Sequence, residues 1–235
     1  MVRNLLFYCY PVRGTSWAWH VPRLLEHRRV FTGRKIITVS IDEKTENPNV
    51  VLRTISPLEA EVRFVENDEK LGEAAHFVDL LGLVKSEKED EATFYAHAKG
   101  VTRHGKDLVP ILNWSWLMYE AALRFPELVD QKLKKAGVVG SLRYQHVAPR
   151  SGWCFAGTFF WFKHSALFRR DWKKIDETFY GVEDYPGVQF KLDESHCLTP
   201  LSPGPNELYS GAITNEFIEK AVEDLSKENR QCIRA

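Results

Sequence analysis

The stretch KIITVSI, residues 35 to 41, gives the clearest strand signal in the sequence and decides the fold class. A near-continuous run of β-branched residues is typical of a strand that is covered on both faces, as in a parallel sheet. Residues 4–10 have the pattern of another buried strand, and residues 17–25 place apolar side chains on one face of a helix between the two. Because the connections are short, the sequence predicts a βαβ unit with a parallel pair and a right-handed crossover.

The same alternation continues along the rest of the chain. Further strand patterns lie at residues 61–65, 92–96, 138–144 and 155–162, and helical patterns lie at residues 71–82, 108–135 and 214–225. Strands that alternate with helices predict an α/β fold, here a three-layer αβα sandwich with a mostly parallel central sheet. There is no internal repeat or linker-like segment, and 235 residues fit one domain over residues 1–235.

The charge balance and the cysteines limit the class of protein. Lys plus Arg and Asp plus Glu number 32 each, so the formal net charge is zero, which argues against nucleic acid as a partner. No segment approaches the roughly 18 to 20 apolar residues that cross a bilayer, and the N-terminus has no signal-peptide pattern. The four cysteines form no CxxC pair and are expected to be free thiols. We therefore expect a cytoplasmic protein without a transmembrane segment.

Polar side chains follow three of the predicted strands. In open α/β sheets, ligands bind outside the carboxyl ends of the strands. Arg13 and Gly14 follow the first strand, and Asp42 follows the second. A carboxylate after the second strand commonly accepts hydrogen bonds from ribose hydroxyls, and a basic group on the same rim offsets a phosphate. This pattern predicts a nucleotide pocket, although Asp42 in a solvated turn is an equally simple interpretation.

The segment HAKG, residues 97 to 100, with Arg103 close behind, follows the fourth strand. If extended geometry continues, His97 and Lys99 project to the same face, and Gly100 lets the backbone turn sharply. An ammonium group with three donors suits phosphate. The alternative is a surface turn with incidental charges. A metal site through His97 and His104 is disfavoured, because no thiolate or carboxylate of suitable spacing joins them.

Two later segments combine aromatic and polar residues. The aromatic strand at residues 157 to 165, GTFFWFKHS, is more typical of a core than of a site, yet Gly157 and Thr158 leave room for a ligand beside the backbone. The segment FYGVEDYPG, residues 179 to 187, is expected to be a loop that carries Glu183 and Asp184 beside Tyr185. Carboxylates next to rings suit a sugar, and one of them can act as a general base. Alternatively, Asp184 simply caps a following turn.

These segments together resemble GT-A-like glycosyltransferases from bacterial surface-polysaccharide loci. The resemblance lies in Tyr95-Ala-His-Ala-Lys-Gly100, in the tryptophan-bearing helix at residues 114–119 and in Gly157-Thr-Phe-Phe-Trp161, and it extends to FTGRKIITVSID at residues 31–42. It implies a nucleotide-sugar donor at the strand ends and transfer of the sugar to a glycan or other acceptor hydroxyl. It also implies Glu183 or Asp184 as the base or acceptor-binding residue.

The resemblance also assigns the remaining site residues. The expected donor-binding residues are Arg13, Asp42, His97, Lys99, Gly100 and Arg103, and the expected substrate-binding residues are Gly157, Thr158, Trp161 and Tyr185.

One departure from the family pattern concerns the metal. Many GT-A enzymes hold a divalent ion, Mn²⁺ or Mg²⁺, with an Asp-x-Asp motif after the fourth strand, where this chain has His97-Ala-Lys99. The acidic triplet at residues 66–68 precedes a helix, where capping explains it. We expect a metal-free site in which cations stabilise the departing diphosphate, with metal dependence left open.

The alternative function is a catalytically silent module of GT-A shape that binds glycan or nucleotide. A nucleotide-dependent phosphotransferase or hydrolase is disfavoured, because the sequence has no phosphate-binding G-x-x-x-x-G-K-[ST] loop. A nicotinamide enzyme is disfavoured because a glycine-rich dinucleotide motif is missing as well.

Overall fold

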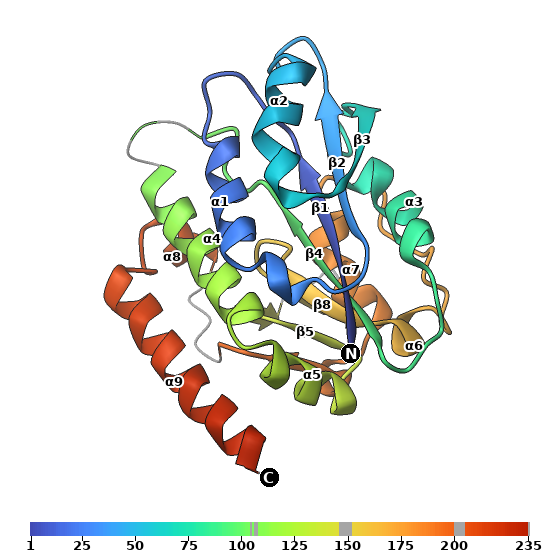
Figure 1. Cartoon of the computed structure of the whole chain (residues 1–235), viewed down its shortest axis with the longest axis vertical. Coiled ribbons are helices and arrows are strands. Elements are labelled where there is room, and N and C mark those ends of the chain that lie inside the picture. Colours follow the sequence, from blue (N-terminus) through green and yellow to red (C-terminus); the bar gives the residue numbers. More distant parts are fainter. Residues whose placement is uncertain (104, 106–107, 146–151, 200–204, 235) are drawn as a thin grey trace.

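A computed structural model describes residues 1–103, 105, 108–145, 152–199 and 205–234 (Figure 1). Within these residues one sheet contains seven strands: β1 (Val2–Cys9), β2 (Lys35–Ile41), β3 (Glu61–Glu66), β4 (Glu91–His97), β5 (Val138–Gly140), β8 (Phe160–Lys163) and β9 (Ser195–Cys197). Their order across the sheet is β3-β2-β1-β4-β8-β5-β9. A separate antiparallel pair joins β6 (Arg143–Gln145) to β7 (Trp153–Phe155).

The sheet is mostly parallel, which confirms the predicted fold class. Strands β1, β2, β3 and β4 pair in parallel, and β5 pairs in parallel with β9. Only β8 among the described strands of this sheet runs the other way, between β4 and β5. The parallel strands therefore bring the polar segments that follow β1, β2 and β4 to one edge of the sheet.

Helices cover both faces of the sheet. The described α-helices are α1 (His20–Glu26), α2 (Pro48–Ile55), α3 (Ala74–Val84), α4 (Leu108–Leu123), α5 (Pro126–Lys135), α6 (His164–Leu167), α7 (Gly181–Gln189), α8 (Pro205–Tyr209) and α9 (Asn215–Arg234). Single 3₁₀ turns lie at Trp17–Trp19, Arg28–Val30, Ser56–Leu58 and Leu192–Glu194.

Two apolar cores separate the three layers. Helices α1, α2, α4, α5 and α9 pack on one face, where alternate β1 residues such as Leu5 and Phe7 point. Helices α3, α6 and α7 pack on the other face, onto residues such as Leu6 and Tyr95. In Figure 1, α1 and α4 lie in front of the sheet, α9 runs along the lower left edge beside α4, and α7 lies behind the sheet. The alternation of β1 side chains between two cores is what a strand buried on both faces requires.

Most of the segment at residues 179–187 lies in a helix and not in the predicted loop. Gly181 and Pro186 read as breakers in the sequence, but Gly181 begins α7 and Pro186 lies inside it. Val182 and Tyr185 are three residues apart, so they share one helix face, and both are buried in the core beneath the sheet. Burial of that face therefore outweighs the weak helical propensity of the segment.

Two predicted strands are each divided by a turn. Residues 155–162 contain the end of β7 and most of β8, because Gly157 and Thr158 between them have φ of 93° and 64°. Residues 138–144 are divided in the same way at Leu142, whose φ is 53°. Left-handed backbone cannot continue an extended strand. The helix α2 was not predicted; it begins with Asn47, whose side chain accepts a hydrogen bond from the backbone of Asn49 at 2.9 Å.

The cysteines are free, as expected. Cys9 and Cys154 are buried, and Cys197 and Cys232 are half-buried. Burial raises the pKa of the Cys9 thiol to about 12, so this group stays protonated. None of the helices in the described part of the chain has the length and apolar character needed to cross a bilayer.

Candidate functional site

The main cavity of the described residues opens at the carboxyl ends of β1 and β4. Its volume is about 740 Å³, which is within the usual range for small-molecule sites. Among its lining residues are four basic side chains and three carboxylates: Lys44, His97, Lys99 and Arg103, and Asp68, Glu69 and Glu73. His97, Lys99, Gly100 and Arg103 were expected at a ligand site from the sequence, and all four line this cavity.

Glu73, the residue before α3, holds the ring of His97. Its Oε2 accepts hydrogen bonds from His97 Nδ1 at 2.9 Å and from the Tyr95 hydroxyl at 2.8 Å. Burial alone would raise the pKa of the Glu73 carboxyl, but His97, Tyr95 and Lys99 outweigh it and hold that pKa below its usual value. Glu73 is therefore an ionised, nearly buried carboxylate next to an imidazole.

The Lys99 side chain reaches the cavity from the α4 side of the sheet, opposite to the side on which His97 lies. The strand ends at His97, and the backbone N–H of Lys99 turns back onto the His97 carbonyl at 2.9 Å. The condition of continued extended geometry is therefore not met. His97 lies against Glu73 near α3, whereas the Lys99 ammonium lies 3.8 Å from the centre of the Trp114 ring in α4. Cation–π contact of this kind stabilises a partly desolvated charge.

The charge of Lys99 is balanced by two carboxylates. Burial lowers the pKa of the Lys99 ammonium below its usual value, and Glu183 and Glu73 oppose that shift while Arg103 adds to it. Lys99 is thus a half-buried cation in a setting with acidic groups on more than one side. Such a group binds an incoming anion in a region of reduced dielectric, where the interaction is stronger than in water.

His20 holds the backbone of Lys99 from beneath. Its Nε2 lies 2.9 Å from the Lys99 carbonyl oxygen, and its Nδ1 lies 3.1 Å from the Tyr119 hydroxyl. A carbonyl only accepts, so Nε2 donates and Nδ1 accepts from the phenol. Burial lowers the pKa of His20 to about 3, so the ring is neutral and this tautomer persists at neutral pH.

Gly100 permits the turn that follows. Its φ is 87°, and a Cβ at this position would lie 2.8 Å from Ile111 Cγ2. Both the backbone angle and the close approach of α4 therefore require glycine.

Arg103, Tyr209 and Glu183 form the outer part of the site. The Arg103 guanidinium lies 5.5 Å from the centre of the Tyr209 ring. Burial raises the pKa of the Tyr209 phenol, Glu183 raises it further, and Arg103 lowers it. Glu183 therefore lies close to Lys99 and Tyr209, which both line the cavity, although Glu183 itself does not. Its Oε1 accepts a hydrogen bond from the backbone N–H of Gly157 at 3.3 Å.

Asp42 and Arg13 lie beside the cavity and not in it. They line a second, more open hollow of about 560 Å³. Asp42 Oδ2 accepts hydrogen bonds from the Tyr10 hydroxyl and from Asn67 Nδ2, and its Oδ1 accepts from the backbone of Lys44. Burial alone would raise the pKa of Asp42, but these hydrogen bonds lower it. Because Tyr10 and Asn67 line the main cavity, Asp42 supports its wall.

Several residues expected to bind substrate are buried instead. The Trp161 indole is fully buried and donates to the Ala122 carbonyl at 2.9 Å. The Tyr185 hydroxyl donates to the Trp172 carbonyl at 2.5 Å. Thr158 and Asp184 are 2% and 3% exposed. Because none of these lines the cavity, we leave them out of the binding surface. Gly157 enters the site only through its N–H bond to Glu183.

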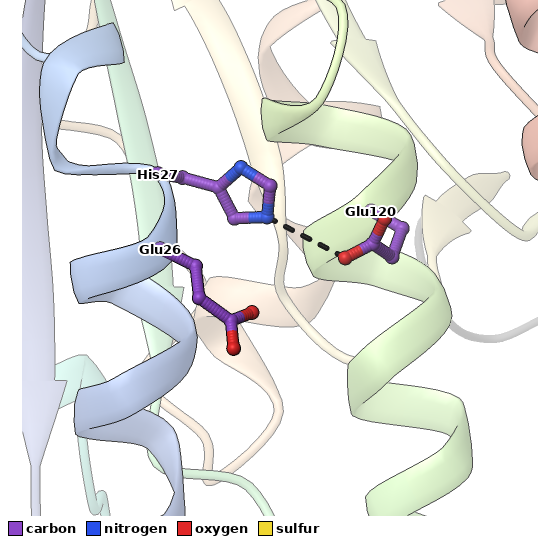
Figure 2. A group of neighbouring side chains, drawn as sticks. All are labelled: Glu26, His27 and Glu120. Atoms are coloured by element: carbon purple, nitrogen blue, oxygen red, sulfur yellow. Dashed lines mark ion pairs between the residues drawn. The ribbon is translucent and has the colours of Figure 1, made fainter.

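A group of metal-type ligands lies elsewhere, between α1 and α4. Figure 2 shows His27 and Glu26 at the end of α1 and Glu120 on α4, with ligand atoms within 4.8 Å of one another. Each carboxylate already has an arginine: Arg23 lies 3.1 Å from Glu26 and Arg124 lies 2.6 Å from Glu120. Burial opposes ionisation of Glu120, but His27 and Arg124 hold its pKa at about 2. This group is an ion-pair cluster between helices.

The cavity does not have the donor set of a divalent metal site. Among the described residues, no group of three histidine, cysteine or carboxylate ligands gathers there. Glu73 is bonded to His97 and Tyr95, Glu69 pairs with Lys44, and Asp68 Oδ1 accepts from the backbone of Lys70 and Leu71. His104 lies outside the described residues. The residues present do not fit the Mn²⁺ or Mg²⁺ that the family resemblance implies, and we assign no step to such an ion.

Several residues that line the cavity have no signal in the sequence. Glu73, Tyr8 and Asn67 carry no local motif, because they become neighbours of His97 only when separate strands and α3 meet. Phe179 and Tyr180 at the mouth are 60% and 52% exposed. Exposed rings next to a glycine and two acids were a signal in the sequence, and these two rings, rather than Tyr185, are at the cavity.

Comparisons with known proteins add a likeness of fold. No protein-family model matches the chain, and no curated protein matches its sequence. The crystal structure of 4-diphosphocytidyl-2C-methyl-D-erythritol synthase matches over 89% of this chain and 96% of that chain, with 14% identity and a TM-score of 0.41. The crystal structure of HddC from Yersinia pseudotuberculosis matches over 94% of this chain and 99% of that chain, with 11% identity and a TM-score of 0.44. At these values neither likeness supports an inference about function.

Proposed function

We propose that this chain is a glycosyltransferase that binds a nucleotide sugar in the main cavity and passes the sugar to an acceptor hydroxyl. The observation that carries the proposal is the gathering of His97, Lys99 and Arg103 on one cavity at the carboxyl ends of the strands. Positive groups at this edge suit the diphosphate of a sugar nucleotide. In this proposal they neutralise the leaving diphosphate without a metal.

The acceptor side of the proposed site is formed by α7 and the segment before it. Glu183 is half-buried, is oriented by the Gly157 N–H and lies near Lys99. A carboxylate so placed takes the proton of the attacking hydroxyl while the bond between the sugar and the diphosphate breaks. The exposed rings of Phe179 and Tyr180 at the mouth offer flat apolar surfaces to the C–H face of a sugar.

A catalytically silent binding module of the same shape is the second candidate. The observation that favours it is that Glu183 and Asp184 do not line the cavity. A ligand would then bind at the cations without a base in contact with it.

A screen of nucleotide sugars by thermal shift, with and without Mn²⁺, tests the proposal. We expect at least one donor to raise the melting temperature without added metal, because a ligand that binds only the folded state stabilises it. Transfer from that donor to a hydroxyl acceptor, followed by mass spectrometry, separates the enzyme from the silent module. The absence of stabilisation by every donor would refute the transferase, and a strict need for Mn²⁺ would refute its metal-free form.

A further inference from the structure

Two polar atoms without a hydrogen-bond partner in the described part of the chain belong to neighbouring residues that line the cavity. Tyr8 on β1 and His97 on β4 occupy paired positions in the parallel register, and both line the cavity. The Tyr8 hydroxyl and His97 Nε2 are buried, and neither has a hydrogen-bond partner among the described residues. Buried polar groups are nearly always paired, because leaving one unpaired forfeits its hydration without return.

The Tyr8 hydroxyl has the character of a donor. Tyr8 is 6% exposed, and burial raises the pKa of its phenol to about 12, with a further increase from Glu73 and a decrease from Ser40. The phenol therefore keeps its proton at neutral pH. The nearby Ser40 hydroxyl donates its proton to Asn67 Oδ1 at 3.2 Å, so that proton is not available to the Tyr8 oxygen.

Glu73 decides which nitrogen of His97 is available. An ionised carboxylate only accepts hydrogen bonds, so Nδ1, at 2.9 Å from Glu73 Oε2, must carry a proton. The remaining nitrogen is Nε2, which becomes a second donor when the imidazole is protonated. The same arrangement, a carboxylate that orients a histidine for a third group, recurs in catalytic and binding sites.

The other groups around His97 have mixed charge. Lys99 follows on the same segment, and the neutral His20 of α1 lies close enough to interact with His97 electrostatically. Phe159 places its ring 6.2 Å away and carries no charge. With Lys99 and Arg103 on the same cavity wall, the surroundings of Tyr8 and His97 are suited to an anion.

We propose that the Tyr8 hydroxyl and His97 Nε2 together bind an anionic oxygen of a diphosphate group, and that Glu73 is the positioning residue that holds His97 for this contact. This inference rests on the proposed function, because the diphosphate belongs to the sugar-nucleotide donor. A ligand oxygen between the two atoms converts two buried, unpaired groups into paired ones, a gain that exposed donors do not offer.

Calorimetric titration with inorganic pyrophosphate, without metal and between pH 5.5 and 8.5, tests the subsite. For the wild type we expect binding in which His97 Nε2 donates to a pyrophosphate oxygen. Tyr8→Phe removes one donor and no internal hydrogen bond, so it should fold normally and bind about 10-fold more weakly at every pH. Glu73→Gln should bind about 10-fold more weakly as well, because the carboxylate that orients the His97 ring is lost. Comparing the variants at equal pH cancels the ionisation of pyrophosphate itself.

Two matched variants serve as controls. Tyr185→Phe removes a phenol that is bonded to the Trp172 carbonyl away from the cavity, and Glu87→Gln changes an exposed carboxylate. Both should bind pyrophosphate as the wild type does. Nitrogen-15 NMR of His97 should show a proton on Nδ1 throughout and a shift of the Nε2 signal when pyrophosphate is added.

The outcomes separate this inference from the transferase proposal. Wild-type affinity in both Tyr8→Phe and Glu73→Gln would overturn the subsite even if the protein transfers sugar. A wild type that does not bind pyrophosphate, or whose Nε2 signal does not respond, would overturn it as well. Weakened pyrophosphate binding in both variants of a protein that moves no sugar would support the subsite and refute the transferase.

Discussion

The imidazole of His20 donates through Nε2 to the backbone carbonyl of Lys99, 2.9 Å away. The strand β4 has already ended at His97, so no sheet partner fixes this carbonyl. A neutral, fully buried histidine on α1 takes over that task, and Tyr119 on α4 fixes the histidine in turn. The position of Lys99 thus depends on α1 and α4, two helices that pack on the same face of the sheet.

The stability of the protein should depend on pH through His20. Burial places its pKa at about 3 in the folded state, against about 6.5 in the unfolded chain. Between these values the unfolded state binds the additional proton, so the free energy of unfolding falls as pH falls. From pH 7 to pH 5 we expect a loss of about 2 kcal/mol from this residue. Urea unfolding of the wild type and of His20→Gln at both pH values measures it.

The two proteins are compared by how much their free energy of unfolding changes with pH, because His20→Gln also lowers stability at every pH. His20→Gln should lose about 2 kcal/mol less than the wild type over the same interval. Equal losses in the two proteins would mean that His20 is protonated in the folded state.

Lys99→Ala should weaken binding of a nucleoside diphosphate about 10- to 100-fold, the range expected for loss of one hydrogen bond to a charged group. Titration calorimetry at low salt measures the affinity. Lys134→Ala, on the exposed side of α5, is the control for a change of net charge. If both variants bind equally well, Lys99 does not contact the phosphates.

Glu183→Gln should leave the affinity for the donor within about twofold and lower the transfer rate by 10² or more, the usual contribution of a general base. The amide oxygen can still accept from the Gly157 N–H, so the fold around α7 is kept. Steady-state transfer assays beside Glu177→Gln, an exposed neighbour, provide the comparison. Full activity of Glu183→Gln would show that Glu183 is not the base.

Gly100→Ala should destabilise the protein by about 2 to 3 kcal/mol, since alanine at positive φ is strained and its Cβ would press on Ile111. Gly14→Ala is a matched test of the backbone angle alone, because Gly14 has φ of 71° and nothing within 4 Å of an added Cβ. It should cost about 1 kcal/mol. Chemical denaturation of both variants gives the difference, and equal costs would mean that α4 yields to the methyl group.

Much of the fold was predictable from periodicity. The run at residues 35–41 is β2 with the same bounds, and the βαβ unit and the parallel sheet follow from it. The sequence misled where positive φ angles interrupt apolar runs, as at Thr158, and where burial sustains a helix with weak local signals, as in α7. Both effects come from the surroundings of a residue and not from its neighbours in the chain.

The site was predictable only in part. His97, Lys99 and Arg103 were found because a strand ends there. Glu73 was not, since the hydrogen bond that joins it to His97 spans separate elements. Asp42 lies beside the cavity, where hydrogen bonds from Tyr10 and Asn67 hold it. Residue type and strand position thus identify the edge of the sheet where ligands bind. Only the side-chain hydrogen bonds show which residues line the cavity and which, like Asp42, lie behind its wall.

The reversed direction of β8 has a consequence for how the chain folds. β8 joins β4 to β5, so the two parts of the sheet stay separate until Phe160 has found Tyr95, far earlier in the chain. During synthesis, a nascent chain that has completed β1 to β5 still presents an open edge on β4, the state most exposed to wrong pairing and aggregation. Long sequence separation makes this closure slow.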